Sequence, residues 1–236
     1  MSIVNTFSLQ SNRQIKINFD GGDLSSDAGL LLIKEFINKL GIERLLNRSF
    51  KTNDSAVFRY HTDRDNLLQM IYMIMAGYFE DDALDELTND PVFKAVLGKS
   101  ALASQPTVSR FFNRMDEDTL KQFQEISQIL RKRIYSIQMP QAVILDLDST
   151  LLEAYGRQDS AHALAYNIFN WFRRLALSAN MRKQRIDTVR LKLLKIAAKV
   201  VHSARYVTFK LCSSCPYKEE FYDTLSTISK LNVQLE

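Results

Sequence analysis

Hydrophobic residues recur at helical spacing along most of the chain, and this pattern predicts a mostly helical protein. Gly and Pro are few, at 7 and 4 residues, so long helices meet few interruptions. Gly41 and Gly98 are expected to end helices, and Asp27 and Pro91 to begin them. The helices that we expect cover residues 27–37, 42–47, 67–78, 92–97, 107–115, 117–135, 162–177, 185–202 and 219–231.

Three segments have the pattern of strands instead. Arg13–Phe19 alternates between polar and apolar residues, and Tyr206–Leu211 also reads as a strand. Ala142–Leu145 is a continuous apolar run, which is typical of a buried strand. We therefore expect a mostly α fold with a small α/β part, divided into a helical N-terminal region, residues 1–138, and an α/β region, residues 139–236.

The length of 236 residues suits one large domain or two small ones. Residues Met1–Asn12 lack the continuous apolar core of a secretory segment. The longest apolar run, Leu67–Phe79, is interrupted by Gln69 and Gly77 and is too short to cross a bilayer. These features predict a cytoplasmic protein without a membrane partner.

Charge is distributed unevenly along the chain. Residues 1–120 contain 13 Lys and Arg against 17 Asp and Glu, a net charge of −4, whereas residues 121–236 contain 18 against 10, a net charge of +8. Between Trp171 and Lys210 the only acidic residue is Asp187. A basic block of this kind suits a polyanion such as nucleic acid, although a solvated helical surface has the same composition.

The predicted helix 185–202 places basic residues in a stripe beside its apolar face. Such a stripe can follow a phosphate backbone, which contributes affinity more than sequence choice. A solvated face and a helix lying on a membrane surface are the alternatives. The basic residues that we assign to DNA contact are Arg185, Lys192, Lys195 and Lys199.

A second DNA-binding candidate is the predicted helix that follows Ser104. Small polar residues and an arginine near its beginning are typical of the recognition helix of a helix-turn-helix, and Phe111 and Phe112 would anchor it to the core. An ordinary capped helix is the alternative. The residues expected to reach bases or phosphates are Gln105, Thr107, Ser109 and Arg110.

Two carboxylates, Asp146 and Asp148, follow the apolar run at Ala142–Leu145. They are two residues apart and therefore share one face of a strand. Carboxylates fixed at the end of a buried strand are suitable ligands for Mg²⁺ in phosphodiester chemistry. A strand end and turn, capped by Ser149 and Thr150, is the alternative interpretation.

Three blocks of the sequence together resemble the group 1 DDE transposases of insertion sequences. The first two blocks run from Gly77 to Phe111, including Asn89–Phe93, and from Ile144 to Gln158. The third contains Ala165–Asn167, Phe172–Leu175 and Ser203–Tyr206. The resemblance implies a ribonuclease H-like core with an Asp-Asp-Glu triad that binds divalent metal, usually Mg²⁺. It also implies an oligomer that cuts element ends and joins them to target DNA.

By this resemblance Asp148 is the first catalytic and metal-binding Asp of the triad, with Asp146 as the weaker candidate. The family's second Asp and its Glu lie between the regions that match Gln158 and Ala165, which are almost adjacent here. We therefore expect an incomplete ribonuclease H-like core that lacks two of three carboxylates. The expected function is that of a transposase impaired in catalysis, with a DNA-binding regulatory remnant or a helical interaction protein as alternatives.

Overall fold

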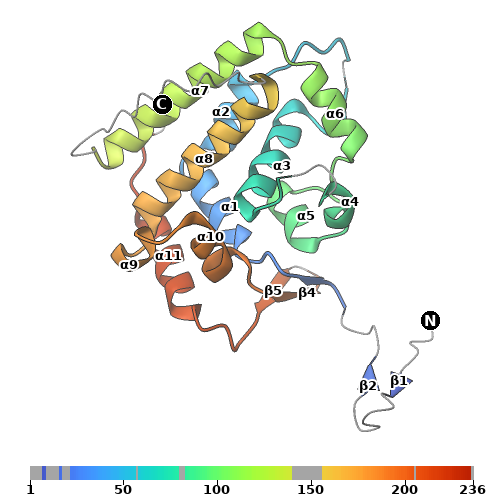
Figure 1. The fold of residues 1–236 in the computed structure, drawn as a ribbon, viewed down its shortest axis with the longest axis vertical. Coiled ribbons are helices and arrows are strands. Elements are labelled where there is room, and N and C mark those ends of the chain that lie inside the picture. The colour runs from blue at the N-terminus through green and yellow to red at the C-terminus, as the bar shows by residue number, and fades with distance from the viewer. Residues whose placement is uncertain are drawn as a thin grey trace.

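Helices form most of the protein, and a small three-stranded sheet lies below most of them in Figure 1. The computed structural model describes residues 7–8, 16–17, 22–56, 58–79, 83–139, 156–204 and 206–234. The prediction of a mostly α fold with a small α/β part is confirmed. The expected strand at Ala142–Leu145, with Asp146 and Asp148, lies outside the described residues.

Helix α3, Asp63–Ala76, is the most deeply buried helix among those described. Every residue from Asp65 to Ala76 is buried, because this helix is apolar over most of its length and is surrounded by other elements. Thr62 begins it with a capping box to Asp65, and Gly77 ends it at φ 95°. The helices that pack against it are α1 (Leu30–Lys39), α2 (Ile42–Ser49), α5 (Pro91–Leu97), α6 (Gln105–Asn113) and α8 (Gly156–Ala176).

Helix α7, Glu117–Ile137, lies beside α8 and points in the same direction (Figure 1). Their C-terminal ends meet where Arg174 Nη2 donates to the carbonyl oxygen of Gln138 at 3.2 Å. The ring of Phe172 on α8 packs edge-on against Phe36 of α1, with centroids 5.5 Å apart. Residues on both sides of position 138 thus contribute to one hydrophobic core. The boundary at residues 138–139 remains a prediction.

The three-stranded sheet joins the two ends of the described chain. Its order is β3 (Leu24–Ser25), β4 (Ala198–His202) and β5 (Val207–Leu211), with both pairs antiparallel. Strand β5 confirms the strand predicted at Tyr206–Leu211. A separate pair joins β1, Phe7–Ser8, to β2, Lys16–Ile17, which lies within the strand predicted at Arg13–Phe19.

The predicted helix 185–202 is wrong in its second half. The chain forms α10 (Ile186–Val189) and one π-helical turn, η1 (Arg190–Leu194), and then becomes β4. Val200 and Val201 favour a strand, and the backbone of β4 finds partners on both sides, in β3 and β5. Tertiary pairing therefore outweighs a helical pattern of apolar residues.

The remaining described helices are α4 (Ala83–Leu87), α9 (Ala179–Arg182) and α11 (Lys218–Lys230). Asp27, expected to cap α1, is instead fully buried two residues before Gly29, which occupies the N-cap position. No helix in the described part of the chain is long and apolar enough to span a membrane.

Candidate nucleic-acid interface

Helix α6 presents the predicted recognition residues on the surface. Val108, Phe111 and Phe112 are buried, as predicted for the two phenylalanines, so the opposite face of the helix is turned outward. Gln105, Ser109 and Arg110 are exposed, and Thr107 is partly exposed. Within the described part of the chain, Arg110 has no hydrogen bond or ion pair and is free to meet a phosphate or a base edge.

The position of α6 is fixed from below by α3. The Gln69 side chain donates to the carbonyl oxygen of Ala103 at 2.9 Å and accepts from the Ala103 N–H at 2.8 Å. Both residues are buried, so this pair of hydrogen bonds satisfies polar groups that would otherwise be costly. Farther along α6, the ring of Phe111 packs against that of Phe50, with the two centroids 6.2 Å apart. The start of α6 is therefore held rigidly, as a recognition element requires.

A network of charged groups holds the C-terminal end of α6. Arg114 forms ion pairs with Asp63 at 3.1 Å and with Asp54 at 3.3 Å. Asp54 also pairs with Arg59, and this hydrogen bond holds the pKa of the Asp54 carboxyl well below its usual range. The backbone N–H of Asn53 donates to the Arg114 carbonyl oxygen at 3.1 Å, which ties the loop before α3 to α6.

A hollow of about 300 Å³ opens between this loop and α6. Its aromatic residues come from the loop, and two of the predicted DNA-binding residues, Thr107 and Arg110, come from α6. The sequence analysis missed the loop residues, although Phe58-Arg59-Tyr60-His61 alternates aromatic and basic side chains, a pattern that suits nucleic acid. Residues lining the hollow include Phe58, Arg59, Tyr60, Asn66, Thr107 and Arg110.

The four predicted cations of the C-terminal half do not form a stripe on one helix. Lys195 Nζ pairs with buried Asp27 at 2.7 Å and lies 3.8 Å from the ring centroid of Tyr78. Lys192 lies over the ring of Tyr217 at 5.0 Å. Arg185 is exposed at the N-cap of α10, and Lys199 is exposed on β4. Of these four residues, Arg185 and Lys199 are therefore the two that are exposed to solvent.

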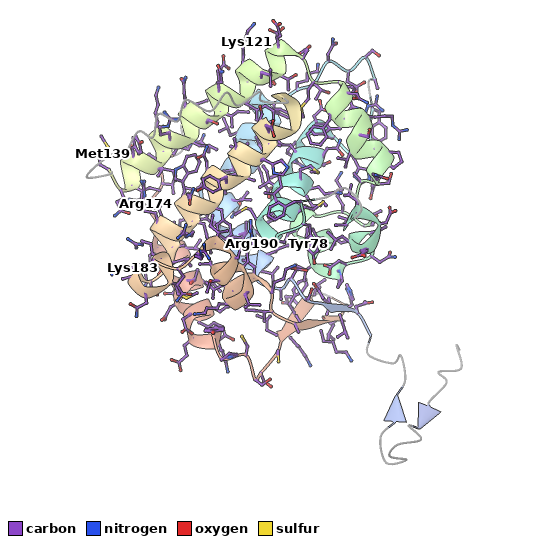
Figure 2. All side chains as sticks on the ribbon, in the orientation of Figure 1. Tyr78, Lys121, Met139, Arg174, Lys183 and Arg190 are labelled. Carbon is purple, nitrogen blue, oxygen red and sulfur yellow. The ribbon has the colours of Figure 1, made fainter. Side chains whose placement is uncertain are left out.

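Other cations of the basic block bind backbone carbonyl groups inside the protein. Arg190 donates to the carbonyl oxygens of Ile74 and Met75, each at 3.0 Å, at the C-terminal end of α3. Figure 2 shows Arg190 beside Tyr78 near the middle of the molecule, whereas Lys183 lies at its edge. Cations at this end of a helix are favoured by its dipole. Much of the positive charge between Trp171 and Lys210 is thus structural.

The predicted carboxylates cannot be placed, because Asp146 and Asp148 lie outside the described residues. Within the described ranges, no three His, Cys, Asp or Glu side chains gather into a group that could hold a metal ion. That part of the protein therefore offers no complete ligand set for Mg²⁺, and we derive no catalytic step through the metal.

A family model described as transposase DDE domain group 1 matches residues 7–163 and 160–233 of the chain. The two matched segments meet at residues 160–163, between Gln158 and Ala165 and inside helix α8. No curated protein and no solved structure matches the chain.

Proposed function

The chain belongs to the group 1 DDE transposase family, and on this basis we propose that it binds DNA through α6 without cutting DNA by itself. The observation that supports DNA binding is the outward face of α6, which carries the exposed Gln105, Ser109 and Arg110 on a rigidly held helix. Thr107 contributes from the flank. Members of this family act on DNA at the ends of a mobile element, so we propose element ends as the target.

Exposed cations of the C-terminal half supply the second part of the proposed interface. Arg185 and Lys199 are candidates for contacts with the phosphate backbone, and Lys192 can contribute its partly exposed amine. Lys195 has a weaker claim, because its charge already compensates buried Asp27. We propose a cytoplasmic location and a homo-oligomer, as for other transposases.

The proposed loss of catalysis rests on the carboxylates. DDE transposases use divalent metal ions, usually Mg²⁺, held by three acidic residues, and only Asp148, with Asp146 as the weaker candidate, corresponds to one of them. A single carboxylate binds a hard cation weakly, since affinity rises with the number of ligands. The two-segment match is consistent with loss of the region that carries the other two. A protein of this kind would compete with an intact transposase for element ends.

DNA binding is tested by fluorescence anisotropy with a labelled duplex from an element end, over a series of salt concentrations. We expect affinity to fall steeply with salt, and Arg110→Ala to reduce the slope of log K against log salt by about 1. Lys230→Ala is the matched control, because Lys230 is exposed on α11, on the opposite side of Figure 1 from α6. Binding that is absent at low salt would favour a protein-interaction role instead.

Catalysis is tested with the same duplex in Mg²⁺ or Mn²⁺, with strand cleavage followed on a denaturing gel. We expect no cleavage from the chain alone. Metal-dependent cleavage that is abolished by Asp148→Ala would overturn the proposal of inactivity and would leave the DNA-binding proposal intact. Inhibition of an intact transposase by the added chain would support competition.

A further inference from the structure

The hollow beside α6 contains a buried polar group without a partner. Asn66 is 1% exposed and lines this hollow from α3. Its Nδ2 donates a long hydrogen bond, 3.4 Å, to the carbonyl oxygen of His61, but its Oδ1 has no partner among the described residues. A buried acceptor left without a donor is costly, which points to a donor supplied by a ligand.

Aromatic side chains stand at the mouth of the same hollow. Phe58 is 84% exposed and Tyr60 is 49% exposed, although both are large apolar rings in a loop. Tyr60 is held in place: its hydroxyl shares a hydrogen bond of 2.7 Å with Ser100, and Lys99 donates to its carbonyl oxygen at 2.8 Å. Exposed rings on a fixed loop are suited to stacking against a flat ligand.

Positive charge completes the site. Three arginines line the hollow, and no carboxylate is among its lining residues in the described part of the chain. Arg59 and Arg114 are held by Asp54, whereas Arg110 has no ion-pair partner among the described residues. The volume of about 300 Å³ is at the lower end of the usual range for small-molecule sites, about 300–1,000 Å³. A ring, an amino group and a phosphate are therefore the features that this hollow is suited to bind.

We propose that the hollow binds one unstacked nucleotide of a DNA strand. The base stacks on Phe58 and donates its exocyclic amino group to Asn66 Oδ1, while its phosphate meets Arg110. Adenine, cytosine and guanine carry such an amino group. Thymine offers only its N3–H, which lies between two carbonyl oxygens that would repel Asn66 Oδ1, so the hollow discriminates against thymine. The inference rests on the proposed DNA binding by α6 and adds a site for a single-stranded end or an extruded base beside that duplex contact.

The experiment compares a blunt duplex with the same duplex carrying a short dC or dT overhang, by anisotropy at one salt concentration. We expect the dC overhang to raise the affinity about tenfold over that of the blunt duplex, which is the scale of one stacked base. The dT overhang should raise the affinity by a smaller factor. Phe58→Ala should remove the gain from both overhangs. Asn66→Leu should remove the difference between dC and dT, while binding of the blunt duplex is unchanged.

The Asn66 variant is expected to fold, because Leu is of similar size and the only described side-chain hydrogen bond that it removes is the long one, 3.4 Å, to the His61 carbonyl oxygen. Exposed Tyr222→Ala on α11 is the control for loss of an aromatic ring. Equal affinities for blunt and overhanging duplexes would overturn the inference and leave the proposed function standing.

Single-stranded oligo-dC and oligo-dT, measured alone, separate the two proposals further. Preference for oligo-dC that depends on Phe58 and Asn66, without binding of any duplex, would support the hollow as a nucleotide site and contradict DNA binding through α6. Failure to bind either duplex or single strand would overturn both.

Discussion

Gly29 lies where α1 begins, against the backbone of η1. A Cβ atom at this position would lie 1.7 Å from the carbonyl oxygen of Leu193 and 2.4 Å from Cα of Leu194. The amide N–H of Gly29 donates to the Leu194 carbonyl oxygen at 3.1 Å, so the two backbones cannot separate without losing this bond. The residue thus joins two segments that are more than 160 positions apart in the sequence.

We expect Gly29→Ala to lower the free energy of unfolding by about 3 kcal/mol or more, because the methyl group meets fixed backbone. Urea unfolding followed by circular dichroism measures the change. Gly98→Ala is the control: Gly98 ends helix α5 at φ 64°, and no described atom lies within 4 Å of its Cβ position. Only the strain of a left-handed residue applies there, about 1 kcal/mol. Equal losses in the two variants would contradict the close approach at Gly29.

Asp65 gives a prediction on pH. Burial alone would raise the pKa of this carboxyl, but hydrogen bonds from Lys99, Arg64 and Thr62 outweigh it and lower the pKa to about 2. A carboxylate with a lowered pKa in the folded state stabilises the fold above its ordinary pKa of 3.8, and this stabilisation is lost as pH falls toward 2. Acid therefore weakens the N-terminal end of α3.

We expect the wild-type protein to lose more stability than Asp65→Asn between pH 5 and pH 2, with a difference of about 2 kcal/mol. Urea midpoints measured across this range give the difference. Asp118→Asn, which removes an exposed carboxylate paired with Lys121, is the control and should follow the wild type. Parallel curves for wild type and Asp65→Asn would show that the ion pairs of Asp65 contribute nothing.

At the scale of elements, the sheet places two lysines opposite each other. Lys199 on β4 faces Lys210 on β5, and both are exposed. Like charges directly opposite each other in an antiparallel pair are destabilising. A surface that keeps such a pair is suited to an anion, and Lys199 is one of the residues that we assign to DNA phosphate.

Lys199→Thr should therefore have two opposite effects. The free energy of unfolding should rise by about 0.5 kcal/mol, since repulsion is relieved and Thr favours a strand. Duplex affinity should fall, with a salt slope reduced by about 1. Thermal unfolding and anisotropy measure the two effects, and Lys183→Thr, on the exposed end of α9, is the control for loss of surface charge. Unchanged DNA affinity would remove the sheet from the proposed interface.

Elements with local signals could be predicted from the sequence, and those that depend on distant partners could not. Pro91 and Gly98 mark the two ends of α5 in the sequence as they do in the structure. Strand β4 was missed because its residues follow a helical pattern of apolar positions, and one of its two partners, β3, lies more than 170 positions away in the sequence. The hollow at Asn66 was missed for the same reason, as it combines a loop, α3 and α6. The spacing of apolar residues also does not predict which basic side chains turn toward the interior. Arg190 turns inward and binds the carbonyl groups at the end of α3.

At the scale of the whole molecule, one core joins both halves of the chain. Phe36 and Phe172 meet in it, and Arg190 binds the carbonyl groups at the end of α3. Trp171, the single tryptophan, lies on α8 and packs against this core. Its fluorescence therefore reports on the C-terminal half, whereas far-ultraviolet circular dichroism reports on all helices.

We expect the two signals to give the same urea midpoint, because helices that share a core unfold together. Phe172→Ala should shift both midpoints equally and cost about 3–5 kcal/mol through the cavity that it leaves. Tyr166→Ala, at an exposed position on α8, should shift neither by much. Separate midpoints in the wild-type protein would show that the halves unfold independently.

Helix α8 runs without interruption through residues 160–163, where the two family matches meet. Adding or removing one residue there turns everything beyond it by about 100° around the helix axis. Ala161 lies within residues 160–163 and Phe172 lies beyond them, yet both side chains are buried in the core. A genetic fusion at this place is thus constrained twice, by the triplet reading frame and by the rotational phase of a helix. Most junctions that keep the reading frame but change the number of residues would rotate the rest of α8 and turn Phe172 from the core toward water.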